Sequence, residues 1–199
     1  RSTLFPYTTL FRSGSCGACG AGIPPYEIKE VIAVTKAYSS AMGAGAFVSE
    51  IFDDEAEELR KRGGDGGEYG ATTGRPRRVG WYDCVASRYG CRIQGATQVA
   101  LTVLDPLGYL DEIPICVGYE IDGKVHEDFP NTTYLYKAKP VLKKLKGWKS
   151  DITGIRDFDK LPVECREYVN EIERRIGVPI TLLSNGPARE DIISRTPLI

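Results

Sequence analysis

One stretch of the chain concentrates residue types that bind anions. Residues 70–83 read GATTGRPRRVGWYD, and Arg75, Arg77 and Arg78 carry planar guanidinium groups. Such groups hold carboxylate or phosphate through paired hydrogen bonds, while threonine hydroxyls and close-approaching backbone N–H groups at the glycines add further donors. The stretch predicts a loop that binds one or more small anions. The alternative is a solvated basic turn without a ligand.

Composition limits the partners of this loop. The chain has 199 residues, of which 42% are hydrophobic and 27% charged, and its formal net charge is −1. A general binder of nucleic acid or of a membrane surface normally has a basic excess, and no apolar run approaches the roughly 20 residues that span a bilayer. We therefore expect small-molecule partners, no nucleic acid and no membrane. Six scattered cysteines differ from a dense disulfide framework and favour a cytoplasmic location.

The first residues differ from the rest. Residues 1–13 read RSTLFPYTTLFRS, contain a near-repeat and resemble a translated sequencing adapter. We interpret them as a non-native leader and assign the fold to residues 14–199, with the chain entering in the middle of a domain.

Cysteine and histidine offer weaker candidates for chemistry. Cys16 and Cys19 form a CxxC without a second pair, and His126 is the single histidine. Zinc needs four ligands, so a tight glycine-rich turn is favoured over a metal or redox site, and His126 is expected at the surface. Cys84 and Cys91 are seven residues apart on one predicted helix face, which favours core packing.

The elements that must position the loop follow from periodicity and caps. Apolar, β-branched runs predict strands over residues 30–38, 98–104, 113–121 and 178–183, and helical spacing with caps predicts helices over 53–62, 83–94 and 161–176. Asp122-Gly123 predicts a hairpin turn into a strand over 124–129, and the basic run 142–148 is ambiguous. Alternating strands and helices predict an α/β fold with a largely parallel central sheet flanked by helices, plus one antiparallel hairpin.

Two polar turns follow strong predicted strands. Asp105 ends the first, and the turn 184–187 (SNGP) ends the second. Ligands bind at the carboxyl ends of parallel strands, so both belong where a nucleotide base would lie.

Five ordered motifs together resemble one family. GATTGRPRRVGW, the upstream TKAYSSAMGAGAFVSE, LTVLD, GWKSDITGI and the terminal GVPITLLSNGP are similar to the adenylosuccinate synthetase family over residues 20–195. The resemblance implies a P-loop-NTPase-like fold and the C-terminal portion of one domain whose N-terminal half is missing.

The resemblance also implies an activity. Members are GTP-dependent ligases that join IMP and L-aspartate to form adenylosuccinate during AMP synthesis. GTP phosphorylates the 6-oxygen of IMP, with Mg²⁺ on the phosphates, and the aspartate amine then displaces that phosphate. The catalytic residues and Mg²⁺ ligands are expected in the missing half, so this chain should be inactive alone. The full-length protein is expected to be a homodimer.

By the family pattern, most site residues lie in the loop and the two strand-end turns. The implied aspartate ligands are Ala71, Thr72, Thr73, Gly74, Arg75, Pro76 and Arg77, and the implied IMP ligands are Arg75 and Met42. The implied GTP ligands are Arg77, Val103, Leu104, Asp105, Ser184, Asn185 and Gly186. Val103 stands where the family pattern has lysine.

A different class of function also has to be weighed. The loop could serve a non-catalytic module that binds anions such as RNA phosphates. Aromatic residues interleaved with basic ones on an exposed strand would favour that function, whereas Trp81 and Tyr82 are expected to open a helix.

Overall fold

The computed structural model describes residues 17–18, 20–64 and 66–195 of the chain. The expected leader and both cysteines of the CxxC lie outside these residues.

The central sheet is largely parallel, as predicted. Its order is β1 (Ile32–Lys36), β5 (Gln98–Thr102), β9 (Ile180–Ser184) and β10 (Ile192–Ser194). The first three are parallel and β10 is antiparallel to β9. The predicted strands were too long at several ends, because β1 stops at Lys36 and β5 at Thr102. Because β1, β5 and β9 are parallel, their carboxyl ends lie at one edge of the sheet.

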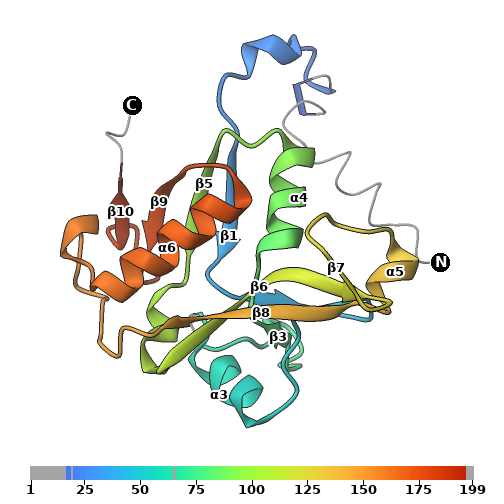
Figure 1. Ribbon diagram of the computed structural model, residues 1–199. Coiled ribbons are helices and arrows are strands. Elements are labelled where there is room, and N and C mark those ends of the chain that lie inside the picture. The colour runs from blue at the N-terminus through green and yellow to red at the C-terminus, as the bar shows by residue number, and fades with distance from the viewer. Residues whose placement is uncertain (1–16, 19, 65, 196–199) are drawn as a thin grey trace.

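Three longer helices begin close to where the sequence predicts, and α3 (Asp54–Arg62) packs against β3 (Arg78–Gly80) instead of the central sheet. The other two are α4 (Cys84–Gln94) and α6 (Val163–Ile176), and Figure 1 shows α6 lying across β5 and β9. The side chain of Asp53 accepts from Glu55 N, and that of Asp83 accepts from Ala86 N at 2.9 Å. α4 and α6 end at glycines in the left-handed conformation.

A second sheet packs beside the first. β6 (Glu112–Ile121) pairs with β4 (Tyr82–Asp83) in parallel and with β7 (Lys124–His126) and β8 (Lys139–Lys146) antiparallel. The hairpin turn is confirmed, although β7 ends at His126 instead of residue 129, and His126 is exposed. The ambiguous basic run 142–148 mostly belongs to β8. Since its lysines are exposed, the run lacked the apolar signal of a buried strand.

A short two-stranded sheet joins the end of β1 to the predicted anion-binding loop. β2 (Ser39–Ala41) pairs antiparallel with β3 (Arg78–Gly80). A Cβ on Gly80 would lie 2.5 Å from Ser49 O, so only glycine fits this crossing. The expectation that Trp81 and Tyr82 open a helix was wrong, because Trp81 lies between β3 and β4, Tyr82 belongs to β4, and α4 begins at Cys84. The remaining short elements are η1 (Pro25–Glu27), η2 (Asp105–Tyr109), α5 (Thr132–Leu135) and η3 (Phe158–Lys160).

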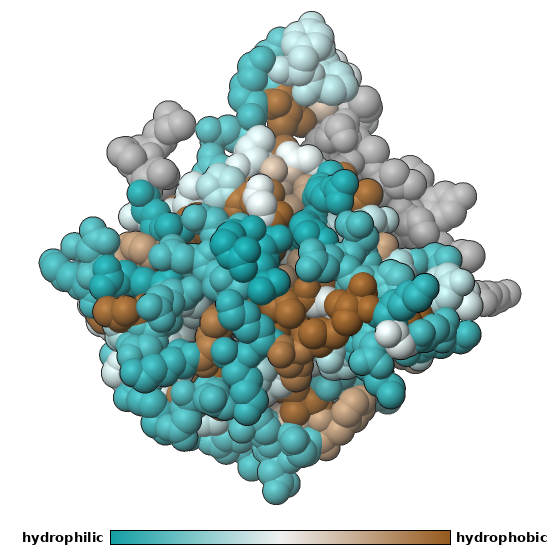
Figure 2. Space-filling view, viewed as in Figure 1, coloured by the Kyte–Doolittle hydropathy of each residue, from teal (hydrophilic) through white to brown (hydrophobic). Residues whose placement is uncertain are grey.

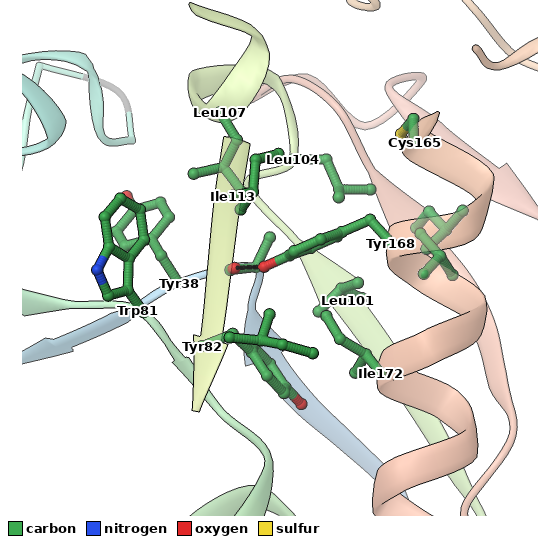
Figure 3. Close-up of a cluster of buried hydrophobic side chains, with 14 of the residues drawn as sticks. Tyr38, Trp81, Tyr82, Leu101, Leu104, Leu107, Ile113, Cys165, Tyr168 and Ile172 are labelled. Atoms are coloured by element: carbon green, nitrogen blue, oxygen red, sulfur yellow. Dashed lines mark hydrogen bonds between the residues drawn. The ribbon is translucent and has the colours of Figure 1, made fainter. Parts of the chain in front are cut away.

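The main core lies between α6 and the ends of the central strands (Figure 3). Tyr168 is fully buried, and its hydroxyl donates to Ala37 O at 2.5 Å. Trp148 packs edge-to-face on Tyr168 with ring centroids 5.9 Å apart. This packing fixes the end of β1 against α6.

The described cysteines are core residues. Cys84, Cys91, Cys116 and Cys165 are free and buried, which confirms the prediction for the first two. Burial raises the pKa of the Cys84 and Cys165 thiols to about 12, so both stay protonated and inert at neutral pH. Most of the face in Figure 2 is hydrophilic, and the described residues include no helix long and apolar enough to cross a membrane.

Candidate functional site

The arginine loop, residues 70–78, is a tight turn closed at its base. Tyr69 and Pro76 form an isolated antiparallel bridge, and Gly70 N donates to Arg75 O at 2.8 Å. Gly74 N donates to Gly70 O at 2.8 Å, and Gly74 has φ +63°, which glycine adopts without strain. Residues 71–76 are exposed, so the tip of the loop can meet a ligand.

Arg78 holds the fold together. Its Nε donates to Glu50 Oε1 at 2.7 Å and its NH2 group contacts the other oxygen of Glu50. Its NH1 group donates to the carbonyl oxygens of Gly43 and Gly45 at 3.1 and 2.9 Å. These contacts fix segment 43–50 beside β3 and leave Arg78 little capacity for a ligand.

Arg75 has the opposite environment. Its side chain is exposed and forms no hydrogen bond or ion pair with any other described residue. Met42 lies near the loop, because a Cβ on Gly70 would be 3.6 Å from the Met42 methyl carbon. The structure thus brings together the two residues that were predicted to bind IMP, although that role stays a prediction.

Arg77 lies at the base of the loop. Its carbonyl oxygen accepts from Arg60 Nε at 2.9 Å, and its NH1 group lies 3.5 Å from Glu68 Oε2. Its buried Nε has no acceptor among the described residues. Sequence reasoning missed Glu68, which is only 2% exposed. The only local signal was a carboxylate directly before a cationic loop.

The carboxyl end of β5 has unusual backbone geometry. Val103 has φ +60°, a region that β-branched residues rarely adopt. Leu104 N then donates to Ser184 O at 3.2 Å, which ties this end to that of β9. Half-burial, with the nearby charges of Asp191 and Asp151, raises the pKa of Asp105 above its usual value.

The turn 184–187 is built around an inward-pointing asparagine. Asn185 is fully buried, and its Nδ2 donates to the carbonyl oxygens of Ile152 and Ile155 at 2.5 and 2.9 Å. Gly186 has no room for a side chain, because a Cβ there would lie 2.4 Å from Asp191 Oδ2. The Ser184 hydroxyl donates to Gly186 O at 2.9 Å and Asn185 N donates to Asp191 O at 3.2 Å, so internal hydrogen bonds fix the shape of the turn.

A cavity of about 440 Å³ opens beside Asp105. Its other lining residues are Arg62, Pro106, Gly108, Tyr109, Lys149, Ser150, Asp151 and Thr153. The arginine loop does not line it, so a ligand in this cavity and one on the loop would occupy different places.

Contacts at the end of β1 connect the base of the arginine loop to the end of β5. Ala37 N donates to Thr102 O at 2.7 Å, which keeps the ends of β1 and β5 level. Burial, the hydrogen bond to Glu68 and the charges of Glu68 and Asp105 raise the pKa of the Tyr38 hydroxyl. Tyr38 therefore lies near the carboxylate at the loop base and the one at the end of β5.

The described residues provide no metal centre. In the described ranges, no group of three or more His, Cys, Asp or Glu side chains could hold a metal ion.

Comparisons with known proteins agree with these features. The family model described as adenylosuccinate synthetase matches residues 2–193, a span that begins within the segment expected to be a leader. The chain belongs to the adenylosuccinate synthetase family. The resemblance and the α/β fold predicted from the sequence are thereby confirmed.

Individual adenylosuccinate synthetases match over nearly all of this chain. The protein from Kineococcus radiotolerans is 44% identical over 197 residues, which are 98% of this chain and 45% of that protein. The protein from Geobacter metallireducens is 45% identical over 192 residues, 96% of this chain and 44% of its own length. The chain thus spans somewhat less than half of these relatives.

A solved structure gives the same result in three dimensions. It is titled as fully ligated adenylosuccinate synthetase from Plasmodium falciparum and matches with a TM-score of 0.86 at 33% identity. The match covers 92% of this chain and 44% of that one. The arrangement of strands around the site is therefore that of the family.

Proposed function

We propose that this chain carries the aspartate-binding loop and guanine-binding residues of a GTP-dependent ligase. The ligase joins IMP and L-aspartate to form adenylosuccinate, with GDP and phosphate as the other products, in AMP synthesis. Family membership supports this activity. The structural observation that carries it is the gathering of the arginine loop, Asp105 and the turn 184–187 around the carboxyl edge of one parallel sheet.

The exposed tip of the arginine loop is suited to aspartate. Aspartate brings two carboxylates, and the loop offers the guanidinium of Arg75 and the hydroxyls of Thr72 and Thr73. We assign the whole run 71–77 to this substrate. Arg75 and Met42 together contact IMP, so one arginine spans both reactants and aligns the amine with the purine ring.

Asp105 is proposed to read the guanine base. Guanine presents an N1–H and a 2-amino group side by side, and an ionised carboxylate can accept from both. Val103 and Leu104 would flank the base, while the turn 184–186 contacts it from β9. The proposal for Asn185 is confined to its backbone, since its side chain is engaged internally. Arg77 would reach the nucleotide from the loop.

Magnesium belongs to the proposal through the GTP phosphates, whose charge it would neutralise. Its ligands are proposed to lie in the part of the relatives that this chain does not span. We also propose a cytoplasmic homodimer without a nucleic-acid partner. An RNA-binding module is disfavoured, because Trp81 and Tyr82 beside the loop are 9% and 1% exposed and cannot stack on bases.

A chimaera tests the proposal. Residues 14–199 replace the aligned segment of the Kineococcus relative, and adenylosuccinate formation is measured with IMP, aspartate and GTP, and with each substrate omitted. We expect product only when all three are present. A chimaera that folds, as judged by circular dichroism, but makes no adenylosuccinate would overturn the proposal.

A further inference from the structure

A buried carboxylate lies where the arginine loop meets the central sheet. Glu68 precedes the loop, and its Oε1 accepts from Lys36 Nζ and from the Tyr38 hydroxyl, both at 2.5 Å. Its Oε2 lies 3.5 Å from Arg77 NH1. One side chain therefore joins the end of β1 to the loop.

Glu68 is ionised in this environment. Burial on its own would raise the pKa of the carboxyl group, but hydrogen bonds from Lys36 and Tyr38 and the charges of Lys36 and Arg77 hold that pKa below its usual value. A buried carboxylate is costly unless it is paired, and here two cations and one hydroxyl share it. Its negative charge also separates two cations that would otherwise repel each other.

Backbone contacts also attach the base of the loop to Glu68. Arg77 N donates to Glu68 O at 2.9 Å, so Glu68 meets Arg77 through both main chain and side chain. Arg77 is otherwise held by Arg60 at its carbonyl oxygen, and its Nε has no acceptor among the described residues. The direction of the Arg77 guanidinium therefore depends on Glu68.

We propose that Glu68 is a positioning residue, which orients Arg77 and holds the arginine loop against β1 so that the loop presents its cations to a dianionic substrate. The identity of that substrate as aspartate rests on the function proposed above. Glu68 itself is too buried to touch the substrate and acts through Arg77.

The neighbouring Arg78 supplies a matched control. It pairs with Glu50, a carboxylate that is 11% exposed, and this pair ties down segment 43–50 instead of the loop tip. Glu50→Gln and Glu68→Gln each remove one negative charge from a glutamate–arginine pair. They differ in which arginine loses its partner, and Glu68→Gln also removes the negative charge that pairs with Lys36.

The first test uses the chimaera and steady-state kinetics. We expect Glu68→Gln to raise KM for aspartate about 10- to 100-fold, as for loss of a hydrogen bond to a charged group. Glu68→Asp should recover part of this loss because it restores the charge.

Combining Glu68→Gln with Arg77→Lys should raise KM for aspartate by less than the product of the single effects. Glu50→Gln should lower Tm while KM for aspartate stays within about twofold. The proposal would be overturned if the KM effects of Glu68→Gln and Arg77→Lys multiply fully in the double variant. It would also be overturned if Glu50→Gln and Glu68→Gln raise KM for aspartate equally.

A second test is independent of enzyme activity. Amide hydrogen exchange is measured on the chain itself, at Gly70, Gly74 and Arg77, whose N–H groups close the loop. Glu68→Gln should speed their exchange about tenfold, and Glu50→Gln should not. Unchanged protection would refute the positioning role. Faster exchange in a chimaera that makes no adenylosuccinate would refute the proposed function alone.

Discussion

The backbone N–H of Leu104 donates to the carbonyl oxygen of Ser184, with 3.2 Å between nitrogen and oxygen. This bond ties the residues after β5 to the end of β9, although Leu104 and Ser184 are 80 residues apart in the chain. It places Asp105 and the turn 184–187 side by side, so two polar turns that the sequence predicted separately become one candidate site for a base.

Asp105→Asn in the chimaera tests the base-reading role. The amide exchanges one acceptor for a donor, so the variant should lose GTP and gain XTP, whose 2-carbonyl can accept from it. Leaving the carboxylate or the base unpaired costs roughly 1–3 kcal/mol, which is about 5- to 150-fold in kcat/KM. The assay compares GTP, ITP and XTP. Asp122→Asn, in the exposed hairpin turn, is the control and should leave the preference for GTP unchanged. A variant that prefers GTP over XTP by the wild-type margin would leave Asp105 only its role in the Asp-Pro turn.

Arg75→Ala in the chimaera should impair the use of aspartate and IMP. Loss of a bidentate charge-assisted contact costs roughly 2–4 kcal/mol, or about 30- to 1000-fold in kcat/KM. Arg75→Lys should rescue little, because an ammonium group cannot reproduce the guanidinium fork. As a control, Arg92→Ala removes an arginine that is 71% exposed on α4. It should leave kcat/KM for aspartate and for IMP unchanged. If kcat/KM for both substrates is unchanged in Arg75→Ala, the loop is a solvated turn.

Val103→Lys should improve the use of GTP. The left-handed backbone at Val103 is costly for a β-branched side chain, and an unbranched lysine relieves part of roughly 1–2 kcal/mol of strain. Its aliphatic stem can also lie along the base. We expect a lower KM for GTP and an unchanged or higher Tm. A higher KM for GTP, or a Tm drop of several degrees, would contradict this.

The isolated chain should associate through β1. This strand is at the edge of the central sheet among the described residues, and its Val34 and Ile32 side chains are 72% and 45% exposed. Exposed apolar edges promote pairing between chains, and a lysine there blocks it. Val34→Lys should therefore shift the chain toward monomer in sedimentation velocity. Val163→Lys, at an exposed helix position, should not. A wild-type chain that is already a monodisperse monomer would show the prediction to be wrong.

Glu171 should make stability depend on acid pH. Partial burial would raise its pKa, but hydrogen bonds from Arg174, Lys143 and Arg175 outweigh this and lower it from 4.5 to about 2. The lowered folded-state pKa gives stability that is complete above about 4.5 and is lost as pH falls toward 2. Allowing for screening at this surface, Glu171→Gln should cost about 1–2 kcal/mol at pH 7 and nothing near pH 2. Urea unfolding across this range measures it, and a loss that is equal at both pH values would contradict the ion-pair origin.

Local patterns in the sequence determined most of the fold. Caps and apolar spacing located α3, α4 and α6 because a helix is defined by contacts three and four residues apart. The three parallel strands and the hairpin turn were found because apolar β-branched runs and an Asp-Gly pair are also local signals. β8 was not recognised because all of its lysines are exposed, which leaves no buried-strand signal. The positive φ of Val103 was also hidden, since valine gives no local indication of it.

Only the tertiary structure decided which charged residue does what. In the sequence Arg75, Arg77 and Arg78 look alike, yet one is exposed, one meets Glu68 and one is held by Glu50. These partners come from segments 9 and 28 residues away. Burial and pairing depend on which distant segments meet, and the free energy of a charge depends on both. The sequence therefore determined that a loop rich in arginine exists, whereas the packing around it decided which of its cations remain available to a ligand.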